Sequence, residues 1–455
     1  MDFNGKKVLM IGMARSGIAA TKLLCQKGAQ VWINDTKTNE ALGDVLATLQ
    51  GSNIVNCLGA KPEQFVPQVD CLVISPGVPL TNAAEVQAKA LGMPVLGEIE
   101  IAYQTSPQTC LVAITGTNGK TTTTALVGAI FAASGAKTHV VGNIGTPYTS
   151  AVLEGVELGD TVVAEISSYQ LETVDAFHPK AAAVLNLTPD HLQRHFTMEN
   201  YAVTKKRIFE NMTQDDYAIL NAEDAYAPLF AQGIAARVLY FHKTKAVEGA
   251  FVQNGNIVVY INGQTHTICP KANLGIPGAH NLENALAATL LAWCCGVPAQ
   301  VIAQGLRTFA GVEHRLQYCG TINGVRFIND SKATNPDSTI KAVQAMDNPT
   351  VMILGGSKKD SDYLPMFLAF TEYIDYAVFV GETTQELLRD AAKAGFTRFV
   401  QAANFADAVN KAFALCKPGY NLLLSPACAS FDAFTDFEER GRVFQSIAAQ
   451  MGAIL

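Results

Sequence analysis

Short apolar runs, many of them β-branched, alternate with longer amphipathic stretches through the first part of the chain. Strand-like runs at residues 6–12, 30–35 and 71–77 are separated by helix-like segments, the clearest of which is 14–28. This alternation is typical of βαβ units and predicts a parallel sheet. The pattern weakens over residues 97–109, so we expect a first domain to end at the start of that stretch.

The same rhythm continues into a second domain, with strand-like runs at residues 110–116, 161–167, 181–187 and 216–221. Between about residues 236 and 269 apolar and polar residues then alternate across two Asn-Gly pairs, Asn254-Gly255 and Asn262-Gly263. Asn-Gly pairs between alternating strands favour two-residue hairpin turns. We therefore expect a small antiparallel patch beside the main sheet.

A third series of strand-like runs follows at residues 325–330, 350–356, 376–382 and 421–427. The chain is longer than one hydrophobic core usually serves, since domains typically hold roughly 100–200 residues. The pattern predicts an α/β protein with three domains in series. We expect a Rossmann-like domain at 1–97, a central phosphate-loop ATPase domain at 98–310, and a Rossmann-like domain at 311–455.

Composition narrows the classes of function. Hydrophobic residues make up 49% of the chain and charged residues 16%, which predicts globular domains with large cores. The formal net charge of -7 argues against a general nucleic-acid-binding surface, because such affinity rests on Lys and Arg neutralising phosphates. The 10 cysteines form no CxxC pair, so we expect reduced core residues. Neither a signal-peptide pattern nor an apolar span of about 18 residues is present, so we expect a cytoplasmic protein without membrane insertion.

The strongest local motif is LVAITGTNGKTTTT, in which a buried strand runs into a glycine-containing loop and a helix. Gly116 and Gly119 let backbone N–H groups approach phosphate oxygens, and Lys120 at the helix start adds a full positive charge. Thr121 is then placed to hold Mg²⁺. The run lacks the first glycine of the general GxxxxGK[ST] pattern. The alternative, an ordinary strand-to-helix turn, is disfavoured by the strand and helix on either side.

The first domain carries a second, weaker phosphate motif. Gly12 and Gly17 have the spacing of a dinucleotide-binding fingerprint, and Asp35 ends the next strand about twenty residues on. Ala14 replaces the middle glycine and narrows the space for a pyrophosphate against the backbone. The motif is therefore compatible with an NAD-type ligand, with a different nucleotide, or with packing alone.

Two further candidates lie at strand ends after the phosphate loop. Glu165 and His191 each follow an apolar run, where an acidic group or a neutral imidazole could complete a Mg²⁺ site. Alone, Glu165 could equally be a helix N-terminal charge, and His191 could have a structural role. Together with the phosphate loop they favour a metal site.

Polar and glycine-flanked clusters mark the third domain, at residues 314–317, 329–338, 354–362 and 425–434. Several of their cationic side chains are accompanied by few anions. This pattern suits an anionic amino-acid substrate, because Arg and Lys pair with carboxylates. Lys358 and Lys359 could equally be solvated loop charges.

Eight of these segments, taken in order, resemble the Mur ligases along the whole chain: residues 115–123, 142–145, 165–172, 186–195, 201–209, 280–288, 329–336 and 425–432. The phosphate loop alone does not choose among related ligases, since folylpolyglutamate synthases share the central domain. NDSKATNP and SPACASFD resemble the branch of the family that adds D-glutamate. The resemblance implies a ligase that joins D-glutamate to UDP-N-acetylmuramoyl-L-alanine in peptidoglycan precursor synthesis.

The family mechanism implies an order of chemical events. ATP phosphorylates the substrate carboxylate to an acyl phosphate, and the incoming amine attacks it through a tetrahedral intermediate to give an amide and phosphate. By resemblance, Lys120 contacts the β- and γ-phosphates, Thr121 and Glu165 hold one Mg²⁺, and His191 helps to hold a second. Lys205 matches a family lysine that CO₂ carbamylates, and its new carboxylate joins the second metal.

The resemblance also implies three sets of binding residues. For ATP they are Gly116, Thr117, Asn118, Gly119, Lys120, Thr121, Thr122, Asn281, Asn284, Arg315 and Asp330. For the UDP-linked substrate they are Ser16, Asp35, Thr36, Gly77 and Asn143. For D-glutamate they are Thr334, Lys359, Ser430 and Phe437. Small-molecule substrates and a monomer are expected, and no nucleic-acid partner.

Other functions remain compatible with parts of the chain. A related ligase could use a folate acceptor and would be separated by product analysis. An NAD-dependent oxidoreductase could be argued from the first domain alone. A nucleotide-dependent switch protein would hydrolyse ATP without needing both small substrates.

Overall fold

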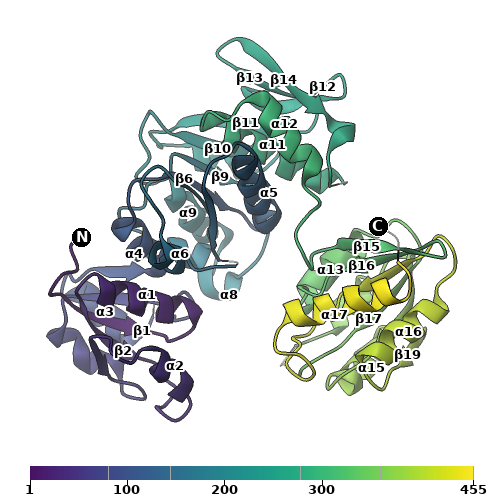
Figure 1. Ribbon diagram of the computed structural model, residues 1–455, viewed down its shortest axis with the longest axis horizontal. Helices are drawn as coiled ribbons and strands as arrows, with labels where there is room; N and C mark the ends of the chain where they lie inside the picture. Colours follow the sequence, from purple (N-terminus) through teal and green to yellow (C-terminus); the bar gives the residue numbers. More distant parts are fainter. Residues whose placement is uncertain (80, 144, 277, 359–360, 454–455) are drawn as a thin grey trace. The chain divides into compact units, whose positions relative to one another are not determined.

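The computed structural model describes residues 1–79, 81–143, 145–276, 278–358 and 361–453. They form two compact units, residues 1–310 and residues 311–455, each considered by itself below. Figure 1 shows every sheet accompanied by helices, with the colour running from purple at the N-terminus to yellow at the C-terminus. The predicted α/β class is confirmed.

The first sheet is parallel and follows the order β3-β2-β1-β4-β5. Its strands are β1 (Lys7–Ile11), β2 (Gln30–Asn34), β3 (Ile54–Asn56), β4 (Cys71–Ile74) and β5 (Val95–Gly97). Its helices are α1 (Arg15–Gln26), α2 (Gly43–Thr48), the 3-10 helix η1 (Pro62–Gln68) and α3 (Ala83–Ala90). The apolar runs predicted β1, β2 and β4, whereas β3 and β5, with 3 residues each, are too short to give a periodic pattern.

The weakly patterned stretch after Gly97 is a helix, α4 (Glu98–Thr105), which the sequence did not indicate. Its pattern is obscured because Glu98 and Glu100 are buried. The Glu98 carboxylate accepts hydrogen bonds at 2.7 Å from the backbone N–H and the hydroxyl of Thr149. Glu100 accepts from three consecutive backbone N–H groups, those of residues 175–177, at 2.8 to 3.1 Å. Buried carboxylates are retained where such donors satisfy them, so α4 is fixed against the central part of the unit.

The central sheet has the order β14-β13-β12-β11-β10-β9-β6-β8-β7. Its strands are β6 (Cys110–Thr115), β7 (Thr138–Gly142), β8 (Thr161–Glu165), β9 (Ala181–Val184), β10 (Tyr217–Asn221), β11 (Arg237–His242), β12 (Gly249–Gln253), β13 (Asn256–Ile261) and β14 (Gln264–Pro270). Neighbouring strands are parallel as far as β12, and β12, β13 and β14 are antiparallel. Both predicted Asn-Gly turns are present, and all four of their residues have positive φ angles between 50° and 78°. The antiparallel strands continue the edge of the main sheet.

Helices accompany the central sheet: α5 (Lys120–Ala133), α6 (Tyr148–Glu154), α7 (Ser168–Leu171), α8 (Leu192–His195), α9 (Met198–Lys206), η2 (Arg207–Phe209), α10 (Ala227–Ala231), η3 (Lys271–Asn273), α11 (Ala279–Cys294) and α12 (Ala299–Thr308). Helices α11 and α12 pack on α5. The helix that follows the phosphate loop is therefore held between the sheet and a second layer of helices.

The second unit contains a sheet of order β15-β16-β20-β17-β18-β19, in which β15 alone pairs antiparallel among the described strands. Its strands are β15 (Gln317–Ile322), β16 (Val325–Asn329), β17 (Thr350–Leu354), β18 (Ile374–Phe379), β19 (Phe399–Gln401) and β20 (Asn421–Leu424). Its helices are α13 (Pro336–Gln344), α14 (Leu364–Leu368), α15 (Thr384–Lys393), α16 (Phe405–Leu415) and α17 (Phe437–Gln450). Helix α17, yellow in Figure 1, packs against β15 and β16.

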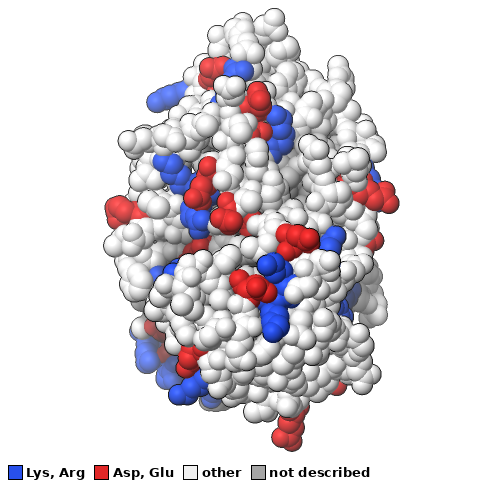
Figure 2. Space-filling model, turned by 90° about the vertical axis from the view of Figure 1, so that its left-hand side faces the viewer, with Lys and Arg blue, Asp and Glu red and all other residues white. Residues whose placement is uncertain are grey.

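The surface and the cysteines refine the picture drawn from composition. All ten cysteines are free, but only Cys57, Cys71, Cys269 and Cys428 are buried, so the expected core location is wrong for the other six. On the face shown in Figure 2, cationic and anionic side chains are intermixed over a largely uncharged surface. Among the described helices, none has both the length and the apolar character needed to cross a membrane.

Candidate active site

The phosphate loop lies at the carboxyl end of β6, at the centre of the main sheet. Gly116 and Gly119 have φ angles of 151° and 81°, and α5 begins directly afterwards at Lys120. A Cβ atom at Gly119 would lie 2.3 Å from Oδ1 of Asn284, and one at Gly116 would lie 3.1 Å from the Cβ of Leu185. Glycine is therefore required at both positions by conformation and by space.

The segment after β9 holds this loop from one side. The Thr117 N–H donates to the carbonyl of Asn186 at 3.0 Å, and the Asn118 N–H donates to the side-chain oxygen of the same residue at 2.8 Å. The Thr117 hydroxyl accepts from the Thr188 N–H at 3.0 Å. These bonds fix the loop before any ligand binds, which lowers the entropic cost of binding.

Two lysines converge on a single carbonyl oxygen of the loop. Lys120 Nζ donates to the carbonyl of Gly116 at 2.9 Å, and Lys205 Nζ donates to the same oxygen at 2.8 Å. Lys205 comes from α9, is 1% exposed, and has its Nζ 4.6 Å from the centroid of the Tyr201 ring. Burial and the nearby charge of Lys120 hold the pKa of Lys205 well below its usual range, so its amine is readily neutral.

Glu165 lies beside the loop because β8 pairs with β6, with Glu165 opposite Ile114. Its side chain is 2% exposed, and Oε1 accepts a hydrogen bond from Asn143 Nδ2 at 3.0 Å. Thr121, on the first turn of α5, is also buried. A carboxylate and a hydroxyl of this kind supply the oxygen ligands that Mg²⁺ prefers. Asn143, predicted from resemblance to bind substrate, contacts this carboxylate here.

His191 occupies the left-handed position that precedes α8, with φ 54°. The Tyr169 hydroxyl lies 3.1 Å from His191 Nδ1, and Asp190 Oδ2 lies 3.6 Å from Nε2. Among the described residues, no three His, Cys, Asp or Glu side chains are grouped so as to hold a metal ion. A metal at this edge would need other ligands, such as the Thr121 hydroxyl.

Asn281 and Asn284 reach the loop from α11. The Thr123 hydroxyl donates to Asn284 Oδ1 at 3.3 Å, and Asn284 Nδ2 donates to Asn281 Oδ1 at 3.2 Å. Since α11 packs on α5, both amides are held close to the start of the phosphate-loop helix. The structure thus brings together residues that are about 160 positions apart.

The predicted substrate residues of the first sheet gather at its carboxyl edge. Asp35 accepts from the N–H groups of Met13 and Lys37 at 2.7 and 3.0 Å and from the Thr36 hydroxyl at 3.4 Å. Burial acts to raise the pKa of Asp35, but these hydrogen bonds outweigh it and lower that pKa. Ser16 lies in the first turn of α1, and Gly77 follows β4.

The turn at Gly12 explains its unusual glycine pattern. A Cβ at Gly17 would lie 1.9 Å from the carbonyl oxygen of Gly12, so Gly17 is required by close packing. The N–H of Met13 is already taken by Asp35. This N–H is thus bonded to a carboxylate of the same sheet edge, which disfavours the dinucleotide mode.

In the second unit, Asp330 is the most perturbed of the predicted residues. It follows β16 and accepts from the Ser425 hydroxyl at 2.7 Å and the Leu316 N–H at 3.2 Å. Burial raises its pKa to about 7, although Ser425 and the charge of Arg315 act in the opposite direction. A carboxyl group with this pKa can exchange a proton near neutral pH.

The predicted D-glutamate residues are only partly described. Thr334 precedes α13, Ser430 is buried in the loop after β20, and Phe437 begins α17. Lys359 lies outside the described residues. Its neighbour Lys358 is 68% exposed and pairs with Glu386 at 2.6 Å, which agrees with a solvated loop charge.

Sequence reasoning missed two buried arginines. Arg440 is 2% exposed and donates to Ser331 and to the carbonyls of Cys428 and Ala429 at 2.8 to 3.2 Å. Arg194 is paired with Glu172 close to His191. An arginine reads as a surface charge in a sequence, and only the position of Arg194 inside the 186–195 motif could have drawn attention to it.

Comparison with known protein families decides the family. The chain matches the Mur ligase MurD-like N-terminal domain over residues 6–97, the Mur ligase middle domain over 114–292, and the Mur ligase glutamate ligase domain over 314–428. The chain belongs to the Mur ligase family. Mur ligases are ATP-dependent, which accounts for the phosphate loop, and the three matches confirm three domains in series.

Two relatives match nearly the full chain. The UDP-N-acetylmuramoylalanine--D-glutamate ligase of Alkaliphilus oremlandii is 45% identical over 454 residues, which cover 99% of this chain and 100% of that protein. The ligase of the same name from Pelotomaculum thermopropionicum is 45% identical over 452 residues, which cover 99% of each chain.

Solved Mur ligase structures share the fold. The UDP-N-acetylmuramate-alanine ligase of Thermotoga maritima superposes with a TM-score of 0.58 at 18% identity, covering 98% of this chain and 99% of that one. A pseudomurein peptide ligase type C from Methanothermus fervidus gives 0.56 at 18% identity, covering 98% and 100%. These similarities support the architecture and carry no argument about substrate.

Proposed function

We propose that this chain is an ATP-dependent ligase that adds D-glutamate to UDP-N-acetylmuramoyl-L-alanine in peptidoglycan precursor synthesis. The observation that carries the proposal is the full-length match, at 45% identity, to two ligases named for this reaction. The phosphate loop with its two converging lysines supplies the chemistry that such a ligase needs. The UDP-linked substrate and the precursor pathway favour a cytoplasmic location, and we propose a monomer.

The domains that we propose are 1–97 for the UDP-linked substrate, 98–310 for ATP and 311–455 for the amino acid. The ATP residues are Gly116, Thr117, Asn118, Gly119, Lys120, Thr121, Thr122, Asn281, Asn284, Arg315 and Asp330. The substrate residues are Ser16, Asp35, Thr36, Gly77 and Asn143, and those for D-glutamate are Thr334, Lys359, Ser430 and Phe437. Substitution of each, followed by determination of KM for each substrate, tests these assignments.

The residues of the loop would act mainly by position and charge. Backbone N–H groups from Gly116 to Lys120 would bind phosphate oxygens, and the Lys120 ammonium would neutralise charge as the phosphoryl group is transferred to the substrate carboxylate. The acyl phosphate formed in this way is an electrophile that the amine of D-glutamate can attack. Exclusion of water from the loop would protect that intermediate from hydrolysis.

Two magnesium ions would be held by Thr121, Glu165, His191 and a modified Lys205. When bound, they would neutralise the phosphate oxygens and polarise the transferred group. Glu165 and Thr121 fit this role because both are buried oxygen donors beside the loop. His191 provides a ring nitrogen next to the same edge, and its Nδ1 contacts Tyr169.

Lys205 would be carbamylated. Its neutral amine attacks the carbon of CO₂, a C–N bond forms, and one proton is released to give a carbamate anion. Burial favours this reaction because only the unprotonated amine is nucleophilic, and the pKa of Lys205 is held low. The product would convert a nitrogen donor into a carboxylate that suits Mg²⁺.

Phosphate release from ATP tests the proposal directly. The chain is supplied with UDP-N-acetylmuramoyl-L-alanine and, in parallel, D-glutamate, L-glutamate, L-lysine or no amino acid. Release with D-glutamate alone supports the proposal. Release with another amino acid, or in the absence of one, would contradict it, and silence throughout would direct the test to a folate-type acceptor.

A further inference from the structure

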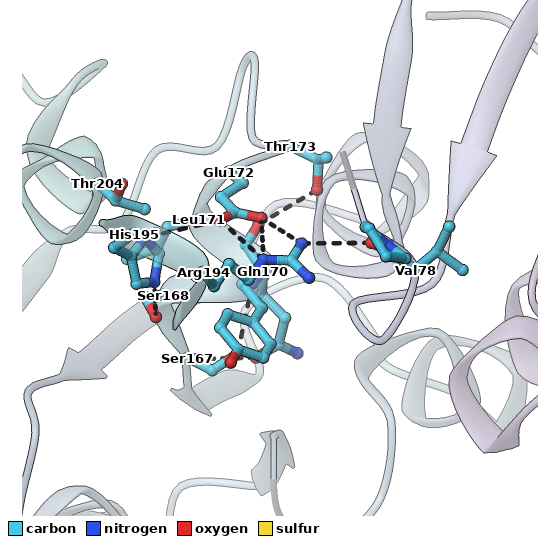
Figure 3. A network of polar contacts seen from close by, with 12 residues as sticks. Val78, Ser167, Ser168, Gln170, Leu171, Glu172, Thr173, Arg194, His195 and Thr204 are labelled. Atoms are coloured by element: carbon cyan, nitrogen blue, oxygen red, sulfur yellow. Dashed lines mark hydrogen bonds and ion pairs between the residues drawn. The ribbon is translucent and has the colours of Figure 1, made fainter. Parts of the chain in front are cut away.

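A largely buried ion pair joins the loop that carries Gly77 to the segment that carries His191. Arg194 lies on α8, and its Nε donates to both carboxylate oxygens of Glu172 at 3.0 Å. Its Nη2 donates to the backbone carbonyl of Val78 at 3.3 Å. Figure 3 shows the guanidinium between the Glu172 carboxylate and Val78, which comes from a different sheet.

Val78 belongs to the predicted substrate edge of the first sheet. It follows Gly77 directly, and its N–H donates to the carbonyl of Ser75 at 2.9 Å, closing a turn. Its Cγ2 lies 3.0 Å from where a Cβ of Gly12 would be. The carbonyl that Arg194 contacts is therefore part of a compact turn packed on the glycine motif of the first domain.

On its other side, Arg194 is connected to His191. The guanidinium carbon lies 4.3 Å from the centroid of the Tyr169 ring, a distance typical of cation–π contact. The hydroxyl of Tyr169 lies 3.1 Å from His191 Nδ1, and the two rings are 5.0 Å apart. Arg194 is thus three residues from His191 along the chain and is linked to it through one aromatic ring.

The charges explain why an arginine is needed here. The side chains of Arg194 and Glu172 are 16% and 11% exposed, so each requires a partner. His195 lies 3.8 Å from Glu172 and 3.0 Å from the Ser168 hydroxyl, and burial lowers the pKa of His195, which keeps its ring neutral. Arg194 therefore balances Glu172. A guanidinium can contact a carboxylate, a carbonyl and a ring at once, whereas an ammonium cannot.

We propose that Arg194 is a positioning residue that holds the Gly77–Val78 turn of the UDP-substrate domain in register with the His191 segment. Binding of the UDP-linked substrate and of Mg²⁺ are thereby coupled, and Glu172 and Tyr169 orient the arginine. This inference rests on the proposed function, since it assigns those two ligands to the two sides of Arg194.

The test compares Arg194→Lys and Glu172→Gln with wild type and with Arg237→Lys. Arg237 pairs with Glu248 in the same unit, on β11, and provides a matched control for the loss of an arginine–glutamate pair. For each protein, steady-state kinetics give KM for every substrate and the Mg²⁺ concentration for half-maximal rate. Calorimetry gives the affinity for UDP-N-acetylmuramoyl-L-alanine without turnover, and thermal unfolding gives Tm.

In Arg194→Lys we expect KM for the UDP-linked substrate and the half-maximal Mg²⁺ concentration each to rise about tenfold, which corresponds to one lost charge-assisted contact. KM for D-glutamate should change less than about twofold, since that contact removes uniform binding of the other substrate only. Glu172→Gln should shift the same two constants in the same direction, and Arg237→Lys should shift neither.

A lower Tm or kcat with unchanged KM, Mg²⁺ dependence and calorimetric affinity would assign Arg194 a purely structural role and overturn the inference. Failure of the proposed function would be seen separately, as wild-type protein that releases no phosphate with D-glutamate. In that event the calorimetric comparison still decides whether Arg194 supports binding at the Gly77 turn.

Discussion

The amine of Lys205 donates a hydrogen bond to the carbonyl oxygen of Gly116 at 2.8 Å, inside the phosphate loop and 89 residues away along the chain. Lys120 donates to the same oxygen, so two potential cations share one acceptor. Two ammonium groups this close repel each other, and burial penalises the charge further. The arrangement is relieved if Lys205 is neutral or if it carries a carbamate.

Lys205→Ala is expected to reduce D-glutamate-dependent phosphate release at least about a hundredfold, because a metal ligand would be lost. Short carboxylates such as acetate, added in excess, should restore part of the rate by entering the space of the carbamate. Lys206→Ala is the control, since Lys206 donates instead to the carbonyls of Leu229 and Gln232. Rescue absent from Lys205→Ala, or equal loss in both variants, would leave the carbamate without support.

Gly119→Ala should weaken ATP binding and stability together. Its φ of 81° is unfavourable for alanine, and the new methyl group would lie 2.3 Å from Oδ1 of Asn284. Gly135→Ala has nearly the same φ, 83°, with no atom within 4 Å, so it isolates the backbone cost of roughly 1–2 kcal/mol. We expect ATP affinity, measured by calorimetry, to fall only in Gly119→Ala. An equal fall in both variants would mean that the clash with Asn284 is unimportant.

The parts of the fold that sequence predicts well are those governed by local rules. Strand β6, the loop and α5 follow from one motif, and both hairpins follow from Asn-Gly pairs, because left-handed φ angles favour those residues. The short strand β3 and the helix α4 were missed, since one is too brief for a period and the other buries two glutamates.

The candidate site shows the same division. Gly116, Lys120 and Glu165 can be predicted from strand ends, whereas the contact of Lys205 with Gly116 depends on how α9 packs. Likewise, no local pattern states that Arg194 reaches Val78, which lies 116 residues earlier. Long-range polar contacts are determined by tertiary packing, and one sequence carries no direct record of them.

The buried carboxyl group of Asp330 predicts a particular dependence of stability on pH. Its pKa is raised to about 7 in the folded chain, against about 3.9 when unfolded. The folded state therefore binds more protons between these values. Stability from this group is complete below about pH 4 and is lost as pH rises to about 7, by up to about 4 kcal/mol.

Asp330→Asn should remove this dependence, because the amide cannot ionise. Thermal unfolding of the ligand-free chain at pH 5 and pH 8 measures the effect: the Tm advantage of the variant over wild type should be larger at pH 8. Asp347→Asn, at an aspartate that is 76% exposed in the same unit, serves as control. A variant whose Tm follows pH exactly as wild type does would show that Asp330 ionises normally.

Arg440 should contribute more to stability than its exposed neighbour Arg442. Arg440 is 2% exposed, and burial lowers its pKa only to about 10, so it stays charged at neutral pH. Its five donors are directed at Ser331 and at the carbonyls of Cys428 and Ala429, which no water would replace after truncation. Arg440→Met should therefore cost about 3 kcal/mol or more and lower Tm by several degrees.

Arg442→Met is the matched comparison. Arg442 is 61% exposed and lies 4.0 Å from Asp436, so its loss should change stability by less than about 0.5 kcal/mol. Arg440→Lys separates charge from geometry, since a single ammonium can satisfy only part of the carbonyl set and should recover only a minor share of the loss. Similar Tm values for the two methionine variants would show that the carbonyls around Arg440 find other donors, and that the loop after β20 does not depend on this arginine.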